Sequence, residues 1–337
     1  MSEPVSLDDV TAAEQWFLLH GLPWFVDAEQ QRVARRLAPR RLARVLGLCA
    51  LPAAGVGIAT GWLKESPSFG LAVAATLTGL LALLYAATAL QLAEIAAWAG
   101  KRTLRQLGLL VPLATRALPL LLIFTVFFFI NTEVWQVASS LPAGVLWLAV
   151  LLFAGVATLF LIARLPEEVD RVVAEVDDDG LVEATSHTPL ADCAARLAQG
   201  RSAGNPLLDV PLNRLERANL VLVLLVVQAG QVLLLAVSVF AFFMLFGAVA
   251  IRPEIVESWI GTGPTFIGWD SSPLSVQLLQ VSIFLAAFSG LYFTVYAVTD
   301  ANYREQFFTQ ITNELTRAVG VRAVYTALRP RPDRLET

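Results

Sequence analysis

The sequence predicts an all-α, polytopic membrane protein with six transmembrane helices and both termini in the cytoplasm. Of its 337 residues, 56% are hydrophobic and only 15% are charged, which is too little charge to cover a soluble domain of this length. The charges cluster between apolar runs long enough to cross a bilayer. In this layout Lys64 and Arg252 are the only basic residues outside, and that bias sets the orientation.

The first 44 residues are predicted to stay in the cytoplasm as amphipathic helices. A helix is expected over 7–19, followed by a break at 20–23, where Gly and Pro interrupt the chain. Aromatic residues after the break are interpreted as a packed turn, with partner docking or gating as the alternative. Asp27 then caps a basic helix that bends at Pro39. Its arginines are expected to bind the headgroups of an anionic inner leaflet: Arg32, Arg35, Arg36, Arg40, Arg41 and Arg44.

Four spans are predicted in the region 45–163. Gly57 and Gly61 in the first span are a small-xxx-small pair that favours close helix packing. Between the second and third spans, basic and apolar residues alternate, which indicates an interfacial amphipathic segment. The four spans and that segment cover 45–63, 69–97, 117–137 and 142–163, with 98–116 at the interface.

The second half of the chain is predicted to hold one soluble insertion and two more spans. Residues 164–217 form the cytoplasmic insertion, which is too poor in apolar residues for an enzyme domain. The transmembrane region 218–299 contains spans 5 and 6, separated by an outer loop at 251–274. Span 5 is longer than a bilayer needs, so we expect tilt or an extension beyond the outer face. The tail 300–337 returns to the cytoplasm.

No catalytic, cofactor-binding or metal-binding constellation is evident in the sequence. Phosphate loops, nucleophile elbows, zinc-binding HExxH motifs and CxxC pairs are all missing. The acidic run at 177–180 lacks the alternating ligands of a calcium loop, so we interpret it as a solvated turn. Cys49 and Cys193 are expected on different sides of the headgroup boundary, without a disulfide. We therefore expect no enzyme, and an intramembrane enzyme acting on lipid is the weakest alternative.

Uncharged polar side chains recur on the last two spans. Their spacing of three, four and seven residues places them near one face of each helix. Two interpretations remain open: the two faces hydrogen-bond to each other as packing contacts, or they line a narrow polar path. Asp300 marks the point where span 6 leaves the membrane. The residues concerned are Gln228, Gln231, Ser238, Ser289, Tyr292, Tyr296 and Asp300.

Several segments resemble an uncharacterised family of actinobacterial multi-pass integral membrane proteins. These segments are HGLPWFVD near the start, RALPLLLIFTVFFFINTEVWQVA from 117, DVPLNRLERANLVLVLLVVQ from 209 and FSGLYFTVYAVTDANYREQFF from 288. The resemblance covers most of the chain. It implies a bacterial inner-membrane location and no particular activity, and it transfers no functional residue.

The best functional expectation from the sequence is transport or a channel-like activity, with a path beside spans 5 and 6. The alternative is a membrane scaffold or partner-binding protein that acts through its cytoplasmic segments. Expected partners are the lipid bilayer with its anionic inner leaflet, further copies of the chain and a cytoplasmic protein. Nucleic acid is not expected, because phospholipid lies closer to the arginines.

Overall fold

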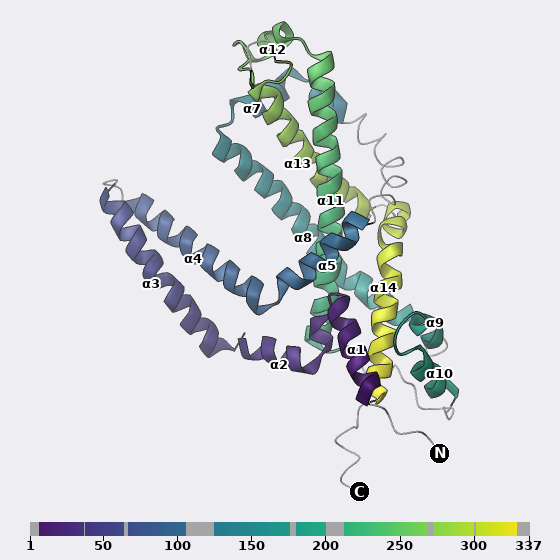
Figure 1. Cartoon of the computed structure of the whole chain (residues 1–337). Helices are drawn as coiled ribbons and strands as arrows, with labels where there is room; N and C mark the ends of the chain where they lie inside the picture. The colour runs from purple at the N-terminus through teal and green to yellow at the C-terminus, as the bar shows by residue number, and fades with distance from the viewer. Residues whose placement is uncertain are drawn as a thin grey trace. The chain divides into compact units, whose positions relative to one another are not determined.

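The computed structural model describes residues 7–36, 38–63, 67–105, 125–175, 180–199, 212–268, 272–299 and 301–328. Within these ranges the chain is helical, with one isolated β-bridge between Phe266 and Ser275. This confirms the all-α prediction (Figure 1). The elements are α1 (Leu7–Leu19), η1 (Pro23–Phe25), α2 (Asp27–Arg36), α3 (Pro39–Leu63), α4 (Pro67–Ala89), α5 (Leu92–Arg105), α7 (Thr132–Ser140), α8 (Ala143–Glu175), α9 (Leu181–Thr185), α10 (Ala191–Gln199), α11 (Arg214–Ala250), α12 (Pro253–Ile260), α13 (Val276–Thr299) and α14 (Ala301–Leu328).

Four of these helices, α3, α8, α11 and α13, are long and apolar enough to cross a membrane. Each corresponds to a predicted span, so the chain has the character of a membrane protein. At 37 residues α11 is about 55 Å long, against an apolar bilayer core of about 30 Å. The expected excess length of span 5 is therefore present. The count of six spans and the cytoplasmic location of both termini stay predictions.

The chain divides into two compact units that combine distant segments. Unit 1 consists of Met1–Ala99, Val176–Val223 and Arg317–Thr337, and unit 2 consists of Gly100–Glu175 and Leu224–Thr316. Three helices, α5, α11 and α14, begin in one unit and end in the other. The boundary between the units therefore runs through predicted span 5 and through the predicted insertion.

In unit 1 the N-terminal turn is packed as the sequence predicted. Helix α1 covers the expected 7–19, and α2 begins at Asp27 after the break. Trp24 and Phe25 in η1 are 4% and 1% exposed. The side chain of Asn219, in the first turns of α11, is buried. It accepts a hydrogen bond from the backbone N–H of Trp24 at 2.9 Å and donates one to the Gly21 carbonyl at 3.1 Å.

The helices α3 and α4 form a tight hairpin in unit 1 (Figure 1). Helix α3 begins at Pro39, where the sequence predicted the bend. A Cβ atom added to Gly57 would lie 2.7 Å from the Cβ of Ala74 and would clash with the Gly70 carbonyl. Because only hydrogen fits there, the two backbones approach closely, and the packing role predicted for the small residues of span 1 is confirmed.

The prediction of one continuous helix over 69–97 is wrong, because α4 ends at Ala89 and α5 begins at Leu92. Gln91 between them has φ 55°. Polar contacts from α2 occupy the break: the Arg36 guanidinium donates to the Thr88 carbonyl at 3.0 Å, and the Gln91 amide donates to Glu29 at 2.6 Å. The first contact supplies a donor to the Thr88 carbonyl, which an uninterrupted helix would have bonded internally, and the second joins two side chains at the break.

The third predicted span, 117–137, is interrupted near its end. Residues 117–124 lie outside the described ranges, 125–129 are helical, and a turn follows at Ile130. Asn131 then caps α7, accepting hydrogen bonds from the N–H groups of Glu133 and Val134. The cap starts a new helix at a position where the apolar pattern alone predicted continuation.

The predicted soluble insertion begins as part of a membrane helix. Helix α8 runs on past residue 163 to Glu175 without a break at Pro166. Two short helices, α9 and α10, follow, and the acidic run at 177–179 lies outside the described residues. The predicted outer loop, 251–274, contains α12 and one side of the β-bridge, neither of which the sequence predicts.

Candidate functional site

The polar side chains predicted on span 5 have different environments in unit 2. Gln228 is fully buried, and neither its amide nitrogen nor its oxygen has a hydrogen-bond partner among the described residues. Gln231 is half-buried, and its oxygen also lacks a partner there. Ser238 is exposed and donates to the Leu234 carbonyl of its own helix at 2.8 Å. Of these three residues, Gln228 is the one with both polar atoms buried and unsatisfied.

On α13 the predicted stripe splits between buried and exposed positions. Ser289 is fully buried and donates to the Leu285 carbonyl at 2.6 Å. Tyr292 is 37% exposed, and its ring stacks on that of Tyr296 with a centroid distance of 6.2 Å and an interplanar angle of 5°. Asp300 lies outside the described residues. The structure thus pairs the two tyrosines with each other.

Sequence reasoning missed Ser282, which lies seven residues before Ser289 and therefore on the same face of α13. Ser282 is fully buried, and its hydroxyl has no hydrogen-bond partner within the described ranges. The spacing of seven could have identified it. Gln228 and Ser282 are the buried polar groups of unit 2 that most need a partner, since an unsatisfied buried group costs about 1–3 kcal/mol.

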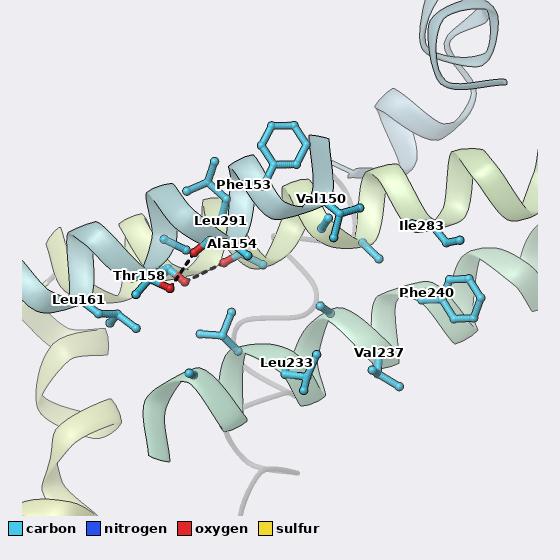
Figure 2. Close-up of a pocket in the computed structure, with 18 of the residues that line it drawn as sticks. Val150, Phe153, Ala154, Thr158, Leu161, Leu233, Val237, Phe240, Ile283 and Leu291 are labelled. Atoms are coloured by element: carbon cyan, nitrogen blue, oxygen red, sulfur yellow. Dashed lines mark hydrogen bonds between the residues drawn. The ribbon is translucent and has the colours of Figure 1, made fainter. Parts of the chain in front are cut away.

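An apolar groove of about 410 Å³ lies on unit 2 between α8, α11 and α13 (Figure 2). Its only hydroxyl-bearing residues, Thr158 and Thr294, donate to the carbonyls of Ala154 and Gly290 in their own helices, both at 2.8 Å. Apart from the indole N–H of Trp147, the lining therefore offers apolar surface and hydroxyls that are already bonded. Its lining includes Trp147, Phe153, Ala157, Leu233, Ala236, Phe240, Ile283 and Ala287.

A second cavity, of about 390 Å³, lies beside the loop between α11 and α13. Arg252 and Ser272 contribute polar groups to it, and Trp135, Phe266 and Leu278 contribute apolar surface. Trp135 is itself held in place, since its indole N–H donates to the Phe129 carbonyl at 2.6 Å. This cavity could not be predicted from the sequence, because its lining combines Trp135 with residues of 247–278.

The six arginines predicted to contact headgroups fall into two groups. Arg32 is paired with Glu29, and Arg36 is directed to the Thr88 carbonyl, so both contribute to the fold of unit 1. The other four are exposed on α2 and α3 and are free of carboxylate partners among the described residues: Arg35, Arg40, Arg41 and Arg44.

Four helices that are long and apolar enough to cross a bilayer, in described ranges that are mainly helical, indicate an α-helical membrane protein. The described residues contain no group of His, Cys, Asp or Glu side chains that could hold a metal ion. The chain matches no protein-family model, no curated protein and no solved structure. Its function must therefore be argued from its own residues.

Proposed function

We propose that this chain is a multi-pass protein of the bacterial cytoplasmic membrane with a transport or channel-like function, and that its path runs beside α11 and α13. The observation that supports this proposal is the pair of buried groups Gln228 and Ser282, which lack partners among the described residues. Lipid tails cannot hydrogen-bond to an amide or a hydroxyl. Water or a polar solute moving beside the two helices could satisfy both.

The chemistry of these residues limits the solute. Gln228, Ser282 and Ser289 are uncharged, so they can exchange hydrogen bonds with water, a neutral polar solute or a partly hydrated ion. They offer no titratable group for passing protons. A charged relay would need the intramembrane Asp, Glu or His residues that mark proton pumps.

The direct test is flux into proteoliposomes that contain the purified protein. Gln228→Leu removes both polar atoms of the amide and should lower the flux several-fold, because the solute loses its partner on α11. Ser238→Ala is the matched control on the same helix, since Ser238 is exposed and bonded to its own backbone. If wild-type flux equals that of empty liposomes under voltage, tension and several ions and solutes, the proposal is wrong.

The orientation that this proposal assumes can be measured independently. We place Lys64 and Arg252 outside the cell, with both termini and the arginines of α2 and α3 inside. Single cysteines at positions 64 and 252, in a background without Cys49 and Cys193, should react with a membrane-impermeant maleimide in intact cells. A cysteine at position 35 should react only after lysis. Labelling at position 35 in intact cells would show that the N-terminal helices lie outside the cell, which is the opposite orientation.

A membrane scaffold is the second candidate, and unit 1 is the observation in its favour. Helix α1 contacts α14 through Tyr325 and Glu14 at 2.8 Å and α10 through Arg196 and Asp9 at 3.9 Å. A well-ordered body of this kind, with four exposed arginines facing an anionic leaflet, could present a surface to a cytoplasmic protein or a second copy. Crosslinking in native membranes followed by pull-down tests this candidate, and the absence of any reproducible partner would exclude it.

A further inference from the structure

The groove between α8, α11 and α13 is separate from the polar path argued above. On α13 its lining residues are Ile283, Ala286, Ala287, Gly290, Leu291 and Thr294, which follow the spacing of three and four residues of one helix face. The unsatisfied Ser282 is not part of that lining. The groove is therefore a different site from the one that contains Ser282.

We infer that the groove is a binding site for one acyl chain of a membrane phospholipid. The three helices that form it are each long and apolar enough to cross a bilayer. The medium around such helices consists of hydrocarbon chains. The two threonine hydroxyls already donate to backbone carbonyls, so apart from the Trp147 indole the lining favours an apolar ligand.

The length of the groove fits a lipid chain of one leaflet. On α13 the lining runs from Ile283 to Thr294, and eleven residues at 1.5 Å each give about 16 Å. Half of the apolar core of a bilayer is about 15 Å thick. This stretch lies in the middle of α13 (Val276–Thr299), so a chain in the groove would lie near the centre of the bilayer, where acyl chains end.

The width of the groove decides between a lipid chain and a helix of a second copy. A volume of about 410 Å³ over about 16 Å gives a cross-section of about 25 Å², or a width of about 6 Å. Carbon atoms in contact lie about 3.5–4.0 Å apart, so a hydrocarbon chain fits this width. A helix with side chains is about 10 Å across, which is wider than the groove.

Small side chains create the depth of the groove. Ala236 on α11 and Ala287 on α13 line it, and neither is fully buried. A Cβ atom added to Gly290 would lie 3.6 Å from the Cβ of Ala236, which is an ordinary van der Waals distance, so helix contact alone does not require a glycine at this position. A large side chain at either alanine would occupy the space that we assign to the lipid.

The test uses nanodiscs of phosphatidylglycerol doped with the same lipid carrying a diazirine in the middle of one acyl chain. After photolysis, mass spectrometry locates the labelled residues. We expect labelling at the groove lining at least five times that at Leu152 and Leu159, which are exposed on α8 but do not line the groove. Ala236→Phe should reduce the groove labelling about tenfold, and Ala241→Phe, on the exposed face of the same helix outside the groove, should leave it unchanged.

The opposite results would overturn the inference. Labelling spread evenly over the exposed faces would mean that the groove holds no particular lipid. Labelling by a diazirine fatty acid but not by the phospholipid would assign the site to free fatty acids, and crosslinks between two copies through Ala236 would assign it to a helix. Ala287→Phe on α13 repeats the test if Ala236→Phe does not fold. Flux through the proposed polar path is measured separately, so either proposal can fail alone.

Discussion

The carboxylate of Glu216 and the guanidinium of Arg322 form an ion pair at 2.9 Å, and their side chains are only 8% and 9% exposed. Both residues belong to unit 1. Glu216 also completes a capping box at the start of α11, because its carboxylate accepts from the Asn213 N–H at 2.8 Å while the Asn213 side chain accepts from the Glu216 N–H at 2.9 Å. One carboxylate thus caps α11 and binds α14.

Arg322→Met should destabilise the protein strongly. The substitution leaves the Glu216 carboxylate buried without its cation, and breaking a buried pair in this way costs about 3–5 kcal/mol. The midpoint of thermal unfolding in detergent measures the effect. Arg164→Met is the control, since the Arg164–Glu167 pair is more than half exposed on both sides and such pairs contribute about 0–1 kcal/mol. Equal midpoints for the two variants would contradict the assigned role of Arg322.

Asn219→Ala should release the N-terminal turn from α11. The variant leaves the Trp24 N–H and the Gly21 carbonyl without their partner, and each unsatisfied buried group costs about 1–3 kcal/mol. Hydrogen exchange of residues 20–26 should accelerate at least tenfold, with little change in the second half of α11. Asn131→Ala is the comparison, because it removes the cap of α7 in unit 2 and should cost about 1 kcal/mol without exposing the turn. Unchanged exchange at Trp24 in Asn219→Ala would show that other contacts hold the turn.

Two glycines of α3 should respond to the same substitution in opposite directions. Gly55→Ala should stabilise the helix by up to about 1 kcal/mol, because alanine is the better helix former and nothing lies near the new methyl group. Gly57→Ala should destabilise the hairpin, because its methyl group would overlap the Gly70 carbonyl. Thermal unfolding of the two variants provides the comparison. A stabilised Gly57→Ala protein would mean that α3 and α4 are farther apart in the membrane.

The sequence was sufficient wherever local chemistry determines the structure. The bounds of α1, the start of α2 at Asp27 and the start of α3 at Pro39 follow from turn and cap residues. It was insufficient at the break after Ala89, because that break is stabilised by Arg36 and other groups distant in the sequence. Apolar periodicity cannot show such contacts.

The candidate sites also include features that the sequence predicted and a feature that it did not. Gln228 and Ser289 were predicted because polar residues are conspicuous in an apolar span, and both are fully buried. The groove was not predicted, since alanine and glycine at its wall read in sequence as ordinary packing positions. Which small residues meet a neighbouring helix and which leave a space depends on how the three helices pack.

Cys193 should be an unreactive thiol whose chemistry depends on Asp9. Burial raises the pKa of the Cys193 thiol above its ordinary value of 9.0, and the hydrogen bond and charge of Asp9 raise it further, while Arg196 acts in the opposite direction. In a Cys49→Ser background, alkylation by iodoacetamide at pH 8 should be much slower than for a free thiol, since the thiolate is the reactive form.

The variant Asp9→Asn separates the effect of Asp9 on the pKa of Cys193 from the effect of burial. It removes the negative charge and should lower the pKa of Cys193 and increase the alkylation rate, while Asp8→Asn, one residue away, should not. Because the folded state holds this proton more tightly than the unfolded state, the thiol stabilises the fold below pH 9.0, and that contribution is lost as the pH rises through the folded pKa. An alkylation rate equal to that of the unfolded chain at every pH would show that Cys193 is open to solvent.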